Sequence, residues 1–142
     1  PDEASRALLV SHLHDQFWSD DYYRAARAIR AWKAERGEGW ARALFDAIER
    51  LDTLPPDERA RVEAVNRGRR FVKSCFRKTQ QMCARGYLRE DDLREHLTMP
   101  QRLRTLFEII EPFERARDPA YRREMFDFYD ALHGGTLERP ER

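Results

Sequence analysis

The chain has 142 residues, enough for one domain that buries a core without disulfide staples, and its two cysteines are too few for a disulfide framework. No apolar run approaches the roughly 18 residues that a membrane span needs, so we expect a water-soluble domain with reduced thiols. The net charge of +1 is unevenly spread: residues 59–89 carry 10 basic and 1 acidic side chains, whereas 1–58 and 90–142 are each net −4.

Helix signals dominate the start of the chain. A first helix is predicted over about 2–17. A second helix begins after Ser19, a good N-cap residue followed by two aspartates, and ends at Gly37. Trp18 and Tyr23 flank this N-cap at the spacing of a hydrophobic staple. The apolar side chains of the first helix recur at one-turn spacing at Leu9, Leu13 and Phe17.

The middle of the chain predicts a short helix and a long one. The short helix spans about 40–51 and ends before a proline pair. The long helix spans about 56–85, and its apolar or small residues recur in steps of three and four, with position 69 as the exception, which indicates a packing seam. Gly68 costs about 1 kcal/mol in a helix, and such a glycine can mark the close approach of a neighbour. We expect one continuous helix, with the seam Val62, Val65, Val72, Phe76, Thr79 and Cys83.

The last third of the chain predicts three further helices. Gly86 ends the long helix, and a short helix with an acidic first turn follows it. The next helix spans about 98–115, and Pro112 inside it predicts a bend. The last helix begins at the Asp-Pro pair 118–119, which supplies an N-cap and a proline at the first helical position, and stops at Gly134.

Together these elements predict an all-α fold. Residues 1–135 form a single-domain bundle of six or seven helices around the long helix, and residues 136–142 form a frayed tail. Strand signals are nearly absent, because no alternating run of β-branched residues and no hairpin turn occurs. The expected core includes Phe17, Trp32, Leu44, Ile48, Val72, Cys75, Phe76, Leu106, Ile110 and Phe128.

The long helix is predicted to be two-sided. A turn of 100° per residue places Cys75 and Cys83 in its apolar arc, as small buried hydrophobic residues. The opposite face is basic, and two interpretations stay open. It is either an anion-binding surface for RNA, DNA or acidic lipid headgroups, or a face neutralised by the acidic segments around it. The candidate anion-binding residues are Arg67, Arg70, Lys73, Arg77, Lys78 and Arg85.

Signals for catalysis or metal binding are sparse. His12 and His14 lie about 200° apart around a helix and do not share a metal. Asp92 and His96 are four residues apart and can meet on one helix face as a local contact. Arg6 and His12 resemble the Arg-x(4 to 6)-His signature of all-helical RNases of the HEPN type, which implies a third hypothesis, an RNase. We predict no catalytic residue, no metal and no cofactor, since no phosphate loop or nucleophile elbow occurs.

The order of features along the chain resembles an uncharacterised helical domain of bacteria, often found just after a single N-terminal transmembrane helix. The resemblance rests on "CARGYLREDDL" and "LRTLFEIIEPFERARDPAY", which resemble the family's glycine turn before an acidic helix and its apolar helix with an internal proline. It implies a cytoplasmic helical module, near the membrane if an upstream segment carries an anchor.

The leading hypothesis from the sequence is a non-enzymatic interaction module that binds a protein partner or self-associates. Such a module predicts an exposed apolar patch of several hundred Å². The alternative is a module that binds nucleic acid or anionic lipid through the basic face of the 56–85 helix, with affinity that falls as salt rises. The HEPN-like RNase is the further alternative.

Overall fold

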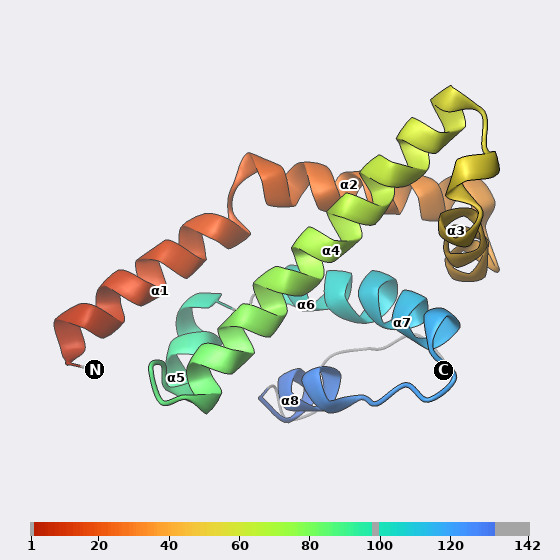
Figure 1. Cartoon of the computed structure of the whole chain (residues 1–142). Helices are drawn as coiled ribbons and strands as arrows, with labels where there is room; N and C mark the ends of the chain where they lie inside the picture. Colours follow the sequence, from red (N-terminus) through yellow and green to blue (C-terminus); the bar gives the residue numbers. More distant parts are fainter. Residues whose placement is uncertain (1, 98–99, 133–142) are drawn as a thin grey trace.

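The computed structural model describes residues 2–97 and 100–132, and within these ranges every regular element is helical (Figure 1). The predicted all-α single domain is confirmed. Because α6 and α7 run on through a π-helical segment as one helix, the described ranges hold seven helices. The α-helical segments are α1 (Glu3–Phe17), α2 (Asp20–Arg36), α3 (Trp40–Glu49), α4 (Pro56–Ala84), α5 (Glu90–Asp92), α6 (Pro100–Thr105), α7 (Glu111–Arg117) and α8 (Glu124–Leu132).

Helix α4 is the centre of the fold. It is continuous through Gly68 and crosses the molecule with α1 and α2 on one side and α6 to α8 on the other (Figure 1). A Cβ added at Gly68 would lie 3.1 Å from the Cα and carbonyl oxygen of Ala25 on α2. The predicted close approach is therefore confirmed, because only a glycine lets these two backbones pack at this distance.

The predicted helix ends are largely confirmed. The Ser19 hydroxyl accepts a hydrogen bond from the backbone N–H of Tyr22 at 3.1 Å and caps α2. Gly37 ends α2 with a φ of 66°, a conformation that favours glycine. The predicted staple at this end of α2 buries little surface, since Trp18 and Tyr23 are 52% and 60% exposed.

The core closely follows the prediction for α4. Val72, Cys75, Phe76 and Thr79 are buried, and Cys83 is half-buried against the core. Of the ten predicted core residues, Ile48 and Phe128 are only partly buried, and the other eight are buried. The Tyr129 hydroxyl of α8 donates to the carbonyl oxygen of Phe76 at 2.6 Å, which ties α8 to α4.

A bend is predicted at Pro112, and the structure has a π-helical segment, Leu106–Ile110, just before the proline. In this segment the N–H of Glu111 donates to the carbonyl of Leu106, five residues back. Pro112 has no N–H to give to the carbonyl four residues back, at Glu108. The Lys33 ammonium of α2 donates to that carbonyl oxygen at 3.3 Å, so the irregular turn also anchors α2.

The predicted start of the last helix is wrong. Asp118 lies in extended backbone at the end of α7, and its carboxylate accepts from the N–H of Ala120 at 2.9 Å. The N–H of Tyr121 donates to the Asp118 carbonyl, so the Asp-Pro pair forms a turn, and α8 begins only at Glu124. The predicted stop at Gly134 lies outside the described residues. The resulting connection, residues 118–123, faces α4 and shapes the candidate site.

None of the helices in the described ranges combines the length and the apolar character needed to cross a bilayer.

Candidate functional site: a cationic cleft beside α4

The predicted basic face of α4 lies mostly in solvent. Arg67, Arg70, Arg77 and Arg85 are exposed, and Lys78 is half-buried. Within residues 2–97 and 100–132 none of these five forms an ion pair. The acidic segments therefore do not neutralise these five residues. They neutralise the sixth predicted residue, Lys73, whose ammonium lies 2.9 Å from the Glu114 carboxylate of α7.

Glu114 is the buried centre of a cluster of positive charge. Its carboxylate contacts the guanidinium groups of Arg69 and Arg117 at 3.5 and 2.7 Å, in addition to Lys73. Burial lowers the pKa of Arg69 to about 10, although Glu114 opposes the shift. Burial also lowers the pKa of Lys73, although the hydrogen bond that its ammonium donates to Glu114 opposes the shift. The cluster thus joins α4 to α7.

Arg69 is the functional residue that the seam analysis excluded. It lies between Val65 and Val72 at the spacing of the seam, it is 6% exposed, and its guanidinium lies 4.2 Å above the Phe113 ring. An arginine on a packing seam of a helix requires a buried anion or an aromatic face nearby. A buried ion pair at position 69 could have been inferred from this spacing, but the spacing does not identify the partner on α7.

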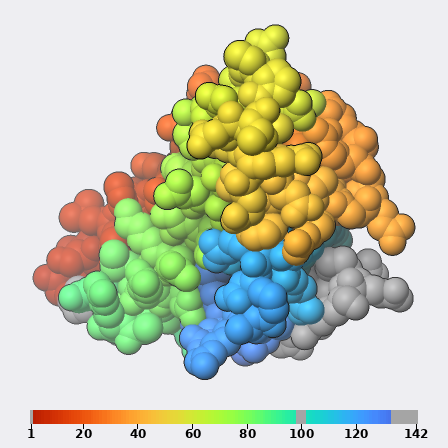
Figure 2. Space-filling view, turned by 45° about the vertical axis from the view of Figure 1, so that its right-hand side comes forward, coloured from red at the N-terminus to blue at the C-terminus, as the bar shows by residue number. Residues whose placement is uncertain are grey.

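A hollow lies where α4 faces α7 and the 118–123 connection, and Figure 2 shows these surfaces side by side in green and blue. Its volume is about 430 Å³, and an adjoining hollow of about 270 Å³ shares Lys73, Arg77 and Arg117 with it. We call the two hollows together the cationic cleft. Its charged lining residues are Arg69, Arg70, Lys73, Arg77, Arg117 and Arg122, against Glu114, Asp118 and Glu124.

The two rims of the cationic cleft differ in charge. The α4 rim presents Arg70 and Arg77, which are exposed and unpaired in the part of the chain that the structure describes. The opposite rim is mixed, with Arg122 beside Asp118 and Glu124. Of the predicted residues, the fold brings Arg70, Lys73 and Arg77 together in the cleft. Arg67, Lys78 and Arg85 lie outside its lining.

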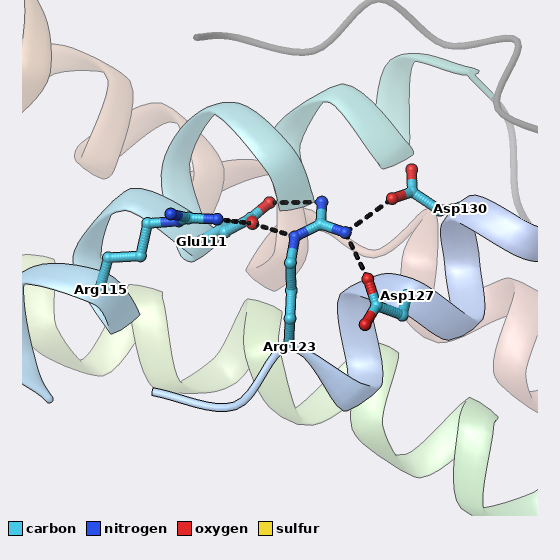
Figure 3. A network of polar contacts seen from close by, with 5 residues as sticks. All are labelled: Glu111, Arg115, Arg123, Asp127 and Asp130. Atoms are coloured by element: carbon cyan, nitrogen blue, oxygen red, sulfur yellow. Dashed lines mark hydrogen bonds and ion pairs between the residues drawn. The ribbon is translucent and has the colours of Figure 1, made fainter. Parts of the chain in front are cut away.

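The far wall of the cleft is fixed by a second ionic network (Figure 3). Arg123 donates to Glu111 at 3.1 Å, to Asp130 at 2.8 Å and to Asp127, so one guanidinium joins α7 to the first turns of α8. Burial opposes the charge of Arg123, but these carboxylates raise its pKa overall. Burial also opposes the charge of Glu111, but the hydrogen bonds that Arg123 and Arg115 donate outweigh burial, so the pKa of Glu111 is lowered overall. The network holds the 118–123 connection in place.

The other candidate residues do not converge on a reactive centre. Arg6 pairs with Asp92 at 3.2 Å, and both line a small hollow with His96, but His12 is not among its lining residues. His96 lies 3.5 Å from Glu95 rather than against Asp92. In the described part of the chain no group of three His, Cys, Asp or Glu side chains is placed to hold a metal ion.

The thiols fit the buried role that the sequence predicts. Cys75 is fully buried, and burial raises its pKa to about 11. Burial also raises the pKa of Cys83. Both groups are therefore protonated at neutral pH, which makes them poor nucleophiles and poor metal ligands.

Comparison with known protein families, curated proteins and solved structures gave no match to this chain. The fold and the site define an all-α domain with a cationic cleft between its central helix and its last two helices.

Proposed function

We propose that the protein is a non-enzymatic interaction module whose cationic cleft binds an acidic segment of a protein partner. The observation that carries the proposal is that Arg70 and Arg77, at the rim of a built cleft, form no ion pair with any residue that the structure describes. Exposed arginines with no internal carboxylate keep their full capacity for bidentate bonds to an incoming carboxylate. A second, buried layer of Arg69 and Lys73 adds positive potential behind them.

The mixed opposite rim favours a peptide over a continuous polyanion. Asp118 and Glu124 would face a phosphate backbone with like charge, whereas a peptide carries separated carboxylates and backbone amides. Gln80 and Gln81 line the same cleft and offer both donors and acceptors to a peptide backbone. The Tyr121 ring is half-buried, packs against Phe126 and has the Arg115 guanidinium 5.2 Å from its centroid, so it is less open to a base than an exposed ring.

Two features bear on the other hypotheses. Among the described residues, the large exposed hydrophobic side chains lie on α1, at the start of α2 and after α4, and none of them lines the cationic cleft. The unpaired arginines of α4 favour the nucleic-acid or anionic-lipid alternative as the second candidate. A cytoplasmic location near a membrane, and membership of the helical domain family named above, stay proposals.

The direct test compares three anions on one protein. Fluorescence anisotropy would measure binding of a labelled peptide of alternating glutamate and serine residues and of a labelled polyuridine oligonucleotide, and sedimentation would measure binding to vesicles containing phosphatidylserine. We expect the peptide to bind at low salt and its affinity to fall as salt rises. The substitution Arg77→Glu should weaken peptide binding by about tenfold or more, since it removes a charged contact and adds repulsion.

A matched control separates a local effect from a change in net charge. Arg24 is exposed on α2 and lies outside the lining of the cationic cleft, so Arg24→Glu should leave peptide binding nearly unchanged. Equal losses in the two variants would contradict the cleft. Binding of vesicles or oligonucleotide but not of the peptide, lost in Arg77→Glu, would overturn the proposal in favour of the second candidate.

A further inference from the structure

A second pocket lies between α2 and α6 and shares no lining residue with the cationic cleft. Its volume is about 360 Å³, and it is lined by Tyr23, Ala26, Arg27, Arg30, Arg102 and Thr105. We call it the aromatic–arginine pocket. It combines three guanidinium groups with an exposed aromatic side chain, a combination that the cleft beside α4 does not have.

The three arginines are held in different ways, and little of their charge is neutralised. Arg30 donates to the Thr105 hydroxyl at 2.8 Å, and its nearest carboxylate, that of Glu108, lies 4.0 Å away. Arg102 lies over the rings of Trp18 and Tyr22, at 4.8 and 5.0 Å. These contacts fix the direction of both guanidinium groups and leave N–H donors for an anion.

Arg27 completes the positive rim of the pocket. Its side chain is exposed, and it has no ion pair within the residues that the structure describes. Three guanidinium groups surround one hollow, and in the described residues their one ion pair is the long contact of Arg30 with Glu108 at 4.0 Å. This arrangement matches the charge and the number of acceptor oxygens of a phosphate group.

The aromatic side chains add a second kind of recognition. Tyr23 in the pocket is 60% exposed, and Trp18, which contacts Arg102, is 52% exposed. Large rings in solvent beside arginines are typical of sites where an aromatic ligand stacks and its phosphate pairs with the guanidinium groups. The volume of the pocket lies within the usual range for small ligands and suits one nucleotide rather than a duplex.

We propose that the aromatic–arginine pocket binds a nucleotide. Arg27, Arg30 and Arg102 contact the phosphate, and the base stacks on Tyr23. The nucleotide is either a free mononucleotide or one unit of single-stranded RNA, since both present the same base and phosphate. This site is independent of the proposed acidic-peptide cleft.

Trp18 supplies the readout for the test. The other two tryptophans, Trp32 and Trp40, are 1% and 7% exposed, so the quenching of tryptophan emission by a base bound beside Arg102 would come from Trp18, which contacts Arg102. The titrants are adenosine monophosphate, adenosine, inorganic phosphate and a short oligoadenylate RNA. We expect adenosine monophosphate to bind more tightly than adenosine or phosphate alone, because only it engages both the rings and the arginines.

Two substitutions separate stacking from phosphate binding. Tyr23→Ala should weaken the binding of adenosine monophosphate by about fivefold or more and leave the binding of inorganic phosphate unchanged, because it removes only a stacking surface. Arg27→Gln should weaken the binding of both ligands, and the affinity for the nucleotide should fall by about tenfold. Both residues are exposed, so folding should be intact, which circular dichroism would verify.

Three control variants complete the design. Trp18→Phe should remove the quenching signal, Arg24→Gln should bind like the parent protein, and Arg77→Glu should bind nucleotide normally. Tighter binding of oligoadenylate than of adenosine monophosphate would identify RNA as the source of the nucleotide. Equal affinities for adenosine monophosphate and inorganic phosphate, or unchanged binding in Tyr23→Ala, would overturn the proposal.

Discussion

Two ionic networks of opposite composition hold the walls of the cationic cleft. In one, the single carboxylate of Glu114 contacts three cations from α4 and α7. In the other, the single guanidinium of Arg123 contacts three carboxylates from α7 and α8. The first leaves positive charge in surplus and the second leaves negative charge in surplus. The same kind of contact therefore supplies anion-binding potential on one wall and fixes the chain on the other.

The largest expected effect comes from breaking the Glu114 network. Glu114→Gln keeps the shape of the side chain but leaves Arg69 buried without a carboxylate, which should destabilise the fold by about 3–5 kcal/mol. Equilibrium unfolding in urea would measure the loss. Glu124→Gln, an exposed carboxylate of the same cleft without an ion pair in the described residues, is the control and should cost little. Similar stabilities of the two variants would show that Glu114 is not the centre of a buried cluster.

Breaking the Arg123 network should lower the free energy of unfolding by less than breaking the Glu114 network does. Its loss should loosen the structure mainly near α8. Arg123→Met removes contacts to Glu111, Asp127 and Asp130, of which Asp127 is exposed, and should destabilise the protein by about 2–3 kcal/mol. Because the network joins α7 to α8, hydrogen exchange should rise first in α8 and not in α4.

Arg122→Met is the matched control for this variant. Arg122 is the preceding residue, it is exposed, and in the described part of the chain it forms no ion pair. Its loss should leave exchange in α8 unchanged. If Arg123→Met raised exchange evenly along α4 and α8, the network would support the whole bundle rather than the wall of the cleft.

The comparison also shows what the sequence determines. The spacing of Val62, Val65, Val72 and Phe76 was enough to predict α4, its length and its buried face, because a helix period is a local property. Position 69 stood out in the sequence only as an exception to that seam, whereas the structure shows that Arg69 is a buried charge. Its partner, Glu114, is 45 residues away, and no local pattern specifies which acidic residue of α7 meets it.

The prediction of where α8 begins failed for a related reason. The Asp-Pro pair at 118–119 fits a helix start as well as it fits a turn, and the local sequence does not choose between them. The choice follows from tertiary contacts, since Arg123 bonds to Glu111 on α7 and holds the preceding residues as a connection. The local sequence therefore did not predict the cleft wall that depends on this connection, whereas it did predict the basic face of α4 that forms the other wall.

The smallest effect, and the sharpest test of the difference between the networks, is the dependence of stability on pH. The pKa of Glu111 is lowered below its ordinary value of 4.5, because hydrogen bonds from Arg123 and Arg115 outweigh burial. A carboxyl group whose pKa is lower in the folded state contributes stability that is fully present above its ordinary pKa. That contribution should therefore be lost as the pH falls from 4.5 through the lower pKa of the folded state.

Urea unfolding of the parent protein and of Glu111→Gln at a series of pH values would measure this contribution. The variant should be less stable at neutral pH, and the difference should shrink as the pH falls below 4.5, because the parent carboxylate also loses its charge there. Asp118→Asn, at an exposed carboxylate with no ion pair within residues 2–97 and 100–132, is the control for a general effect of charge. A difference between Glu111→Gln and the parent that stays constant with pH would mean that the side chain supports α8 by its shape. The ionic contrast between the two walls would then not account for the stability of the second one.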